Sequence, residues 1–376
     1  MSENAENADL ARLLTEPGPW TFVYVDGPGD EPQPAEASRH RSVRDRLVQL
    51  GAPPDDVDAV AEALETPTGL PSPSARYLLV RGGRVELDER FPGARRGPER
   101  LGHAPIPEIL PLLRHRAADV HYLVVETGRE GAQLRLERAG RLPERVEDVD
   151  GIEDDLQKVP AGGWADARHQ RHAEDVWMHN QAEVAGAVDE LVRERRPGFV
   201  VLAGDIRARQ LLEERLSAPS RQLVIEVDAH TRAPGARDDA LDAAIDAAVD
   251  ARRRNSEADA LDRAAVDGGR SGSRGLGEVV RALQEARVHT LVLDARLVDD
   301  ERTLDALDAP PWIAEGGDDA LAAGSIARLP IAEALARAAV LGSARVIVTE
   351  DEAAAPDAPR DDRPAHEPVA VLRWPD

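Results

Sequence analysis

The chain has 376 residues, a length that predicts two or three domains, and 42% of its residues are hydrophobic although only 3% are aromatic. Because it contains no cysteine, disulfide bonds and thiolate metal sites are excluded. Its formal net charge of -24 argues against sequence-independent binding of nucleic acid over the whole surface, but leaves room for one focused contact.

The first predicted domain covers residues 1–118 and contains both strands and helices. Apolar runs between turn residues predict the strands, and Pro54, followed by two aspartates, suits the start of a helix. In chain order we expect a strand at 20–25, a loop at 27–38, helices at 42–50 and 54–64, and a hairpin at 77–87. This part of the chain is therefore predicted to be an α/β domain.

The second predicted domain covers residues 119–267 and is built around a long helix at 172–196. Trp177, Val184 and Val188 mark one face of this helix at helical spacing, and Leu191 and Val192 continue that face. At 1.5 Å per residue the helix would span roughly 37 Å. The other elements expected here are strands at 122–126, 133–136, 199–203 and 222–227, a loop at 146–167, and helices at 207–216 and 238–254.

The third predicted domain covers residues 268–376 and opens with a glycine-rich stretch. The remaining elements expected here are helices at 278–286 and 331–341, strands at 290–293, 345–348 and 369–374, and an acidic, proline-rich loop at 350–368. Alternating helices and strands predict an α/β sandwich.

Two adjacent glycines, Gly162 and Gly163, stand in the loop that precedes the long helix. Glycine gives a loop the freedom to enter tight spaces, and Arg168 and Arg171 follow shortly afterwards. Over residues 158–172 the chain carries three fixed positive charges and one negative charge, in contrast to its acidic total. The pattern predicts a protruding loop that contacts phosphates.

The order of hairpin, Gly-Gly loop, arginine-bearing helix and the strand VVLAG resembles the central domain of archaeo-eukaryotic class-1 peptide release factors and of pelota. Residues 276–294 (LGEVVRALQEARVHTLVLD) and 331–348 resemble parts of their third domain. The resemblance covers about residues 119–376, whereas residues 1–118 do not resemble the codon-reading domain of those factors. This combination is similar to the bacterial branch of the family, which includes the Balon-type ribosome hibernation factors of actinobacteria.

The resemblance implies a three-domain α/β fold whose central domain has a mixed sheet and a protruding Gly-Gly loop. In release factors this loop reads Gly-Gly-Gln and helps water to attack the peptidyl-tRNA ester. Here Trp164 takes the place of the glutamine, and an indole has one N–H donor and no acceptor, so it cannot orient water as an amide can. Gln170 lies seven residues after Gly163, outside the family's register.

We therefore expect no catalytic residue, no metal and no cofactor. The residues to which the resemblance gives contacts with ribosomal RNA are Gly162, Gly163, Trp164, Arg168, His169, Gln170 and Arg171. Trp164 either stacks on a base of that RNA or packs on its own domain.

Simpler interpretations apply to several other features. Adjacent glycines alone are more often a plain turn than a functional tip. Residues 268–275 have the composition of a phosphate-binding loop, but they lack Gly-Lys-Ser/Thr, which favours a linker. Ala203-Gly204-Asp205 ends a strand before a helix, where an ordinary turn is favoured over an anion site.

Four titratable residues near the long helix, His169, His172, His179 and Asp175, invite comparison with a metal site. No glutamate-containing zinc signature accompanies them, so solvated or phosphate-facing histidines are favoured.

The preferred hypothesis is a cytoplasmic, monomeric hibernation factor that occupies the ribosomal A site and protects the peptidyl-transferase centre without hydrolysis. The resemblance also implies a translational GTPase as a partner, and no apolar run is long enough for a signal peptide or a membrane span. The alternatives are a peptidyl-tRNA hydrolase or ribosome-rescue release factor with a non-standard loop, and a stress-response module that binds proteins only.

Overall fold

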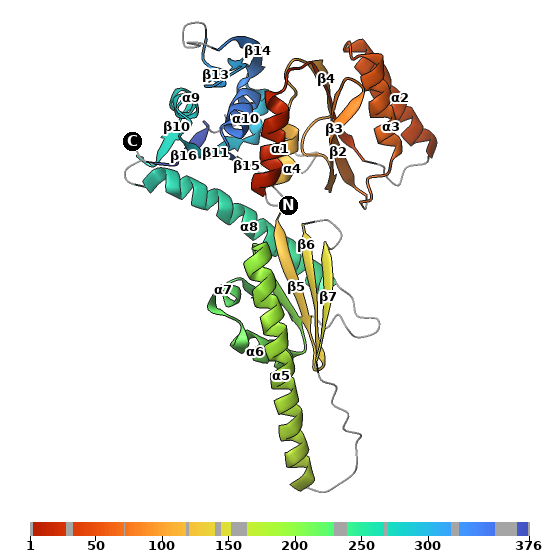
Figure 1. Cartoon of the computed structure of the whole chain (residues 1–376), viewed down its shortest axis with the longest axis vertical. Coiled ribbons are helices and arrows are strands. Elements are labelled where there is room, and N and C mark those ends of the chain that lie inside the picture. Colours follow the sequence, from red (N-terminus) through yellow and green to blue (C-terminus); the bar gives the residue numbers. More distant parts are fainter. Residues whose placement is uncertain are drawn as a thin grey trace. The chain divides into compact units, whose positions relative to one another are not determined.

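The computed structural model describes residues 3–27, 33–70, 72–117, 120–139, 144–151, 164–228, 239–266, 270–316, 323–349 and 367–374. For the helical residues 3–6, 33–35, 117, 164–175 and 239 it describes the backbone only. The chain forms a mixed α/β fold, as predicted, and divides into two compact units (Figure 1). Unit 1 comprises residues 1–118 and 255–376, and unit 2 comprises residues 119–254.

The N-terminal part of unit 1 is an antiparallel sheet in the order β3-β2-β1-β4. Its strands are β1 (Trp20–Asp26), β2 (Ser74–Arg81), β3 (Arg84–Pro92) and β4 (Arg100–Ala104), and its helices are α1 (Glu3–Thr15), α2 (Gln33–Gln49), α3 (Pro54–Glu65) and α4 (Leu110–Ala117). Alternation along β1 sends Val23 and Val25 into a core with α2 and α3, and Phe22 and Tyr24 into a second core on the opposite face.

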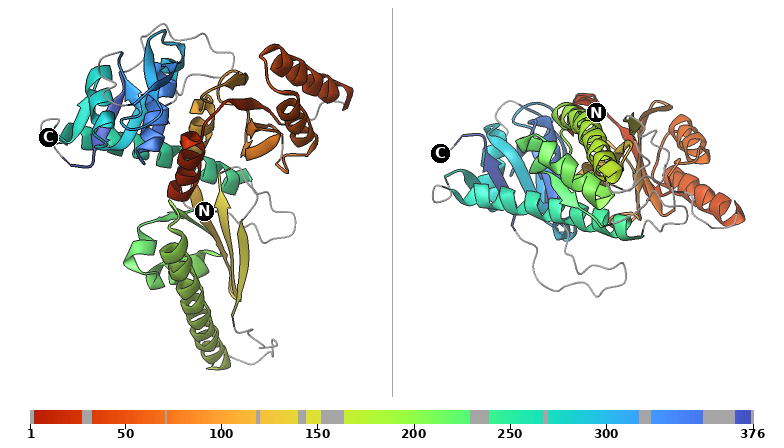
Figure 2. Two further views of the ribbon diagram at one scale, coloured as in Figure 1. Left: turned by 45° about the horizontal axis from the view of Figure 1, so that its top comes forward. Right: turned by 90° about the horizontal axis from the view of Figure 1, so that it is seen from below.

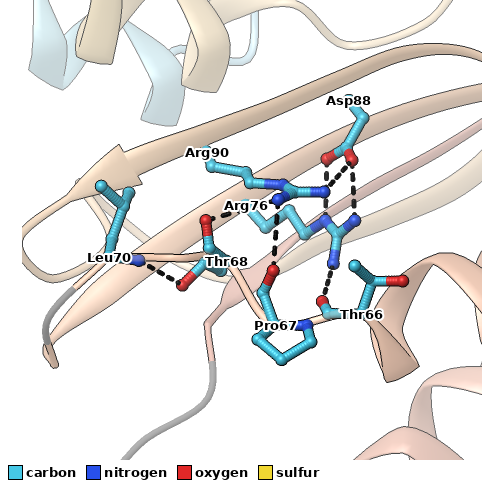
Figure 3. Close-up of polar contacts among 7 residues, drawn as sticks. All are labelled: Thr66, Pro67, Thr68, Leu70, Arg76, Asp88 and Arg90. Atoms are coloured by element: carbon cyan, nitrogen blue, oxygen red, sulfur yellow. Dashed lines mark hydrogen bonds and ion pairs between the residues drawn. The ribbon is translucent and has the colours of Figure 1, made fainter. Parts of the chain in front are cut away.

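A partly buried ion pair joins the two strands of the first hairpin (Figure 3). Arg76 on β2 is 2% exposed and donates from Nε and Nη2 to both carboxylate oxygens of Asp88 on β3, at 2.8 and 2.7 Å. Burial alone would raise the pKa of Asp88, but the hydrogen bonds from Arg76 and then Arg90 hold it below its ordinary value. The same two arginines donate to backbone carbonyls of residues 66–68, so they also fix the chain that leads into the hairpin.

The C-terminal part of unit 1 contains two further sheets, in the orders β10-β16-β11-β15 and β13-β12-β14. The elements are β10 (Gly272–Arg274), α9 (Leu276–Gln284), β11 (Val288–Asp294), η2 (Ala295–Asp299), β12 (Thr303–Leu307), β13 (Ile313–Ala314), β14 (Ser325–Pro330), α10 (Ile331–Leu341), β15 (Arg345–Thr349) and β16 (Val369–Leu372). Helix α10 packs against α1 and α4, so the two ends of the chain share one hydrophobic core.

Unit 2 is a mixed five-stranded sheet in the order β7-β6-β5-β8-β9, with helices on both faces. Its strands are β5 (His121–Thr127), β6 (Gly131–Arg138), β7 (Arg145–Asp150), β8 (Val200–Gly204) and β9 (Val224–Glu226), and its helices are α5 (Trp164–Arg195), α6 (Ile206–Arg215), α7 (Ala218–Arg221) and α8 (Asp239–Ala265). Strands β5, β8 and β9 are parallel, whereas β6 and β7 are antiparallel to their neighbours. The mixed sheet predicted for this region is confirmed.

Helix α8 crosses the division between the units. Leu241, Ile245 and Val249 in its first half belong to the core of unit 2. Ala260 and Ala264 in its second half belong to a core of unit 1. The predicted helix at 238–254 is therefore present but continues for a further eleven residues, to Ala265.

Several predicted bounds were wrong for identifiable reasons. Helix α2 begins at Gln33, inside the loop predicted at 27–38, because its first turns are polar and give no apolar period. Strand β7 lies in the loop predicted at 146–167, and its mostly exposed, charged residues are typical of an edge strand. Strand β10 lies in the stretch predicted to be a linker at 268–275.

The division of unit 1 into separate domains at 1–118 and 268–376 stays a prediction. Besides β7 and β10, the elements that the sequence did not predict are α1, β4, α4, α7, η2, β12, β13 and β14. Most of these are three to eight residues long, too short for a period to stand out.

Candidate functional site

The predicted RNA-contacting residues lie at and just before the first turns of α5. Gly162 and Gly163 lie outside the described residues. Trp164 is the first residue of the helix, and the remaining four (Arg168, His169, Gln170 and Arg171) follow within its first two turns, where the backbone alone is described.

This position of the helix start corrects the prediction of a loop at 162–171 followed by a helix from His172. Helix α5 begins eight residues earlier, at Trp164. Residues 165–168 (Ala-Asp-Ala-Arg) favour this start, because alanine and arginine are strong helix formers and Asp166 lies at the positive end of the helix dipole. Positions 164, 168 and 171 are spaced by four and three residues, so the helix places them along one face.

The first part of α5 has no apolar stripe. Between residues 165 and 175 the only apolar residues are three alanines, whereas a stripe suited to a core begins at Val176. The helix has 32 residues, or roughly 48 Å, of which residues 164–175 account for roughly 18 Å. Figures 1 and 2 both show this part of α5 continuing beyond the strands of unit 2.

Two buried amides hold α5 to the sheet where its apolar stripe begins. Gln181 is fully buried; its Oε1 accepts a hydrogen bond from the Thr127 hydroxyl at 2.8 Å, and its Nε2 donates to the Gly128 carbonyl at 2.9 Å. Asn180 is 1% exposed and donates to the Arg129 carbonyl at 3.2 Å. The turn between β5 and β6 is thereby tied to one point on the helix.

The loops around this point fit closely against the helix. A Cβ added to Gly151 would lie 2.2 Å from Cγ of Asn180, so only glycine fits there. In the turn between β5 and β6, the guanidinium of Arg129 lies 4.9 Å from the ring centroid of Trp177 on α5, which is a cation–π contact. Further along α5, Val184 and Val188 are buried in a core with residues of the sheet, so the predicted apolar face of the helix is confirmed for these two residues.

No sequence pattern marked Thr127, Asn180 or Gln181 as functional residues. The one indication available was the adjacent pair of amides at the start of an apolar stripe, where polar side chains must find partners if they are buried. Their partners lie more than fifty residues away in the chain, which no local pattern reveals.

The other candidate sites have simpler explanations. Asp205 caps α6 by accepting hydrogen bonds from the N–H groups of Arg207 and Ala208, which confirms the ordinary turn at 203–205.

Within the described part of the chain, no group of three His, Asp or Glu residues could hold a metal ion. His179 lies on exposed surface, 3.5 Å from Glu183, and the side chains of His169, His172 and Asp175 lie outside the description. No helix in that same part is long and apolar enough to cross a membrane.

Residues 121–270 match the model of bacterial archaeo-eukaryotic release factor family 2, so this part of the chain is release-factor-like in sequence. A search of curated proteins found no match.

Solved structures align with the chain at low identity. An archaeal translation termination factor, aRF1, is 15% identical over 99% of this chain and 98% of its own, with a TM-score of 0.26. Pelota from Archaeoglobus fulgidus is 16% identical over 80% and 79%, with a TM-score of 0.36. Dom34 from S. cerevisiae, a translation termination-like factor that interacts with Hbs1, is 10% identical over 80% and 80%, with a TM-score of 0.40.

Proposed function

We propose that this chain is a ribosome-binding translation factor that occupies the A site and protects the peptidyl-transferase centre without hydrolysing peptidyl-tRNA. The observation that carries the proposal is the family match over residues 121–270, because that segment contains both Gly162-Gly163 and α5. The hibernation role, the cytoplasmic location and a translational GTPase as partner are parts of this proposal.

The geometry of α5 supports contact with RNA phosphates. The helix brings positions 168 and 171 onto the face of position 164, and the positive end of the helix dipole lies at the same end. Two guanidinium groups on such a face can each pair with a phosphate. The buried amides at Asn180 and Gln181 fix the direction of the helix that carries positions 168 and 171.

The absence of hydrolysis follows from Trp164. An indole accepts no hydrogen bond, so it cannot position an attacking water through an acceptor oxygen, as an amide side chain can. A flat aromatic ring can instead stack on an exposed base, which contributes about 1–3 kcal/mol. Gly162 and Gly163 would allow the backbone to come close to the RNA.

The test is co-sedimentation of purified protein with ribosomes in a sucrose gradient. We expect the double variant Arg168→Ala/Arg171→Ala to bind about tenfold more weakly or worse, since two charge-assisted hydrogen bonds are lost. The matched control is Arg193→Ala/Arg195→Ala, which removes the same charge from the exposed last turn of α5 and should bind like the wild type. Added salt should weaken ribosome binding by the wild type more than binding by Arg168→Ala/Arg171→Ala, which has fewer phosphate contacts to lose. Equal binding by both double variants and the wild type would refute the assignment of this face.

A peptide-release assay distinguishes the proposal from its alternative. On ribosomes that carry peptidyl-tRNA, the wild-type protein should leave the ester bond between peptide and tRNA intact. Release of peptide by the wild type would instead identify a peptidyl-tRNA hydrolase or rescue release factor. No binding to ribosomes from either growing or starved cells would favour a module that binds proteins only.

A further inference from the structure

A cavity of about 550 Å³ lies within unit 1, where the two ends of the chain meet. Its size falls in the range of small-molecule sites. Most of its wall is apolar, and the residues that carry the argument are Trp20, Pro105, Ile106, Asp308, Ile326 and Arg337. The loop at residues 16–19, between α1 and β1, completes the wall.

The walls of this cavity are held in place by contacts of their own. Arg81 donates to the Pro17 carbonyl at 2.9 Å, pairs with Glu16, and lies over the Trp20 ring at 4.4 Å, so one side chain fastens the whole loop. A Cβ added to Gly18 would lie 2.4 Å from the Pro105 carbonyl oxygen, so the loop and the opposite wall are in close contact. These contacts fix the loop that forms one side of the cavity.

Arg337 is the unusual member of the lining. It lies on α10 and is 3% exposed, yet its one hydrogen bond within the described part of the chain runs from Nη1 to the Trp312 carbonyl at 3.3 Å. Its Nε is buried and makes no hydrogen bond with any described residue. Burial of a guanidinium without an acid partner is costly, and buried arginines are normally paired.

The acids nearest to Arg337 along the chain and in the lining are engaged elsewhere. Glu333, one helical turn earlier, accepts hydrogen bonds from the backbone N–H groups of Ile109 and Leu110. Burial is the main reason why the pKa of Glu333 is raised to about 8, so this group is largely neutral at pH 7. Asp308 accepts from the Gly324 N–H at 2.8 Å, and Glu16 pairs with Arg81. Burial lowers the pKa of Arg337 to about 10, which leaves it charged.

We infer that this cavity binds a small organic anion, with a carboxylate or phosphate paired to Arg337 and an apolar body against Trp20, Ile106 and the prolines. A guanidinium recognises both oxyanions through the same paired hydrogen bonds. The ligand would supply the partner that the described residues do not, while the prolines and the indole bury its apolar part. This site is independent of the proposed ribosome-binding face.

The experiment uses the full chain and three probes: benzoate, phenyl phosphate and inorganic phosphate. Benzamide is the neutral probe of matched shape, and sodium chloride matches the ionic strength. At concentrations about tenfold above the dissociation constant, benzoate or phenyl phosphate should raise the melting temperature of unit 1 by roughly 2–4 °C. Comparison of the carboxylate and the phosphate identifies which oxyanion is preferred.

Two variants make the result decisive. Arg337→Met should melt no lower than the wild type without ligand, because an unpaired buried charge is removed, and should lose the response to every anion. Ile326→Trp leaves Arg337 intact and places a larger side chain in the wall of the cavity, and should weaken the response to the aromatic anions. Equal shifts in wild type and Arg337→Met, an equal shift with benzamide, or no shift with any anion up to about 10 mM would overturn the inference.

Discussion

Glu333 is a buried acid on α10, and it links this helix to the N-terminal part of the chain. Its carboxyl group accepts hydrogen bonds from the N–H groups of Ile109 (2.9 Å), just before α4, and of Leu110 (3.1 Å), the first residue of α4. Burial raises its pKa from 4.5 to about 8, and the negative charge of Glu108 acts in the same direction, whereas these two hydrogen bonds and Arg100 oppose the change.

This pKa predicts a stability that depends on pH. Between pH 4.5 and about 8 the unfolded chain has released the proton of Glu333 while the folded chain still holds it, so stability falls as pH rises through this window. The fall is on the order of a few kcal/mol. Glu333→Gln cannot ionise, and we expect calorimetric melting at about pH 5.5 and about pH 8 to differ less in this variant than in the wild type. Glu285→Gln, which removes a half-exposed carboxylate, should keep the wild-type difference. A wild-type difference in Glu333→Gln would contradict the assignment.

At the scale of single elements, the first part of α5 should behave as an independent segment. Proline at position 173 removes a helical hydrogen bond and clashes with the preceding turn, at a cost of about 3 kcal/mol or more. Because residues 164–175 have no apolar stripe to bury, we expect Ala173→Pro to unwind about nine residues, seen by circular dichroism, without lowering the melting temperature of the core of unit 2. The control is Ala165→Pro in the first turn, where proline is tolerated, and it should keep its helicity. A lower melting temperature in Ala173→Pro would mean that this segment contributes to the core.

The success of the sequence predictions varied with the kind of element. Helix α10 was predicted with its observed bounds, because Pro330 precedes it, Gly342 follows it and the residues between are strongly apolar. The start of α5 was missed because a polar helix has no hydrophobic period, and the predicted start depended on that period. For the candidate site, the Gly-Gly pair and the arginines could be found from the sequence. The amides that anchor α5 could not, since their partners lie on a distant turn.

At the scale of the whole molecule, unit 1 is discontinuous in the chain, because unit 2 is inserted between residues 118 and 255. Since the core of unit 1 draws on α1, α4 and α10 together, we expect fragments 1–118 and 255–376 to co-purify when they are expressed together, and to unfold without cooperativity when each is alone. Size-exclusion chromatography and calorimetry of the separate and combined fragments provide the measurement. Cooperative, monomeric unfolding of each fragment alone would instead favour the division into three domains.

The insertion has a consequence for how the chain is made. At about 5–20 residues per second, synthesis of the 136 residues from 119 to 254 takes roughly 7–27 s. During that interval the apolar side chains of α1 and α4 have been produced, but α10, against which they pack, has not. Nascent chains of this protein should therefore pass through a period in which the apolar side chains of α1 and α4 are exposed to solvent. A chaperone that binds exposed apolar segments would be expected to bind there.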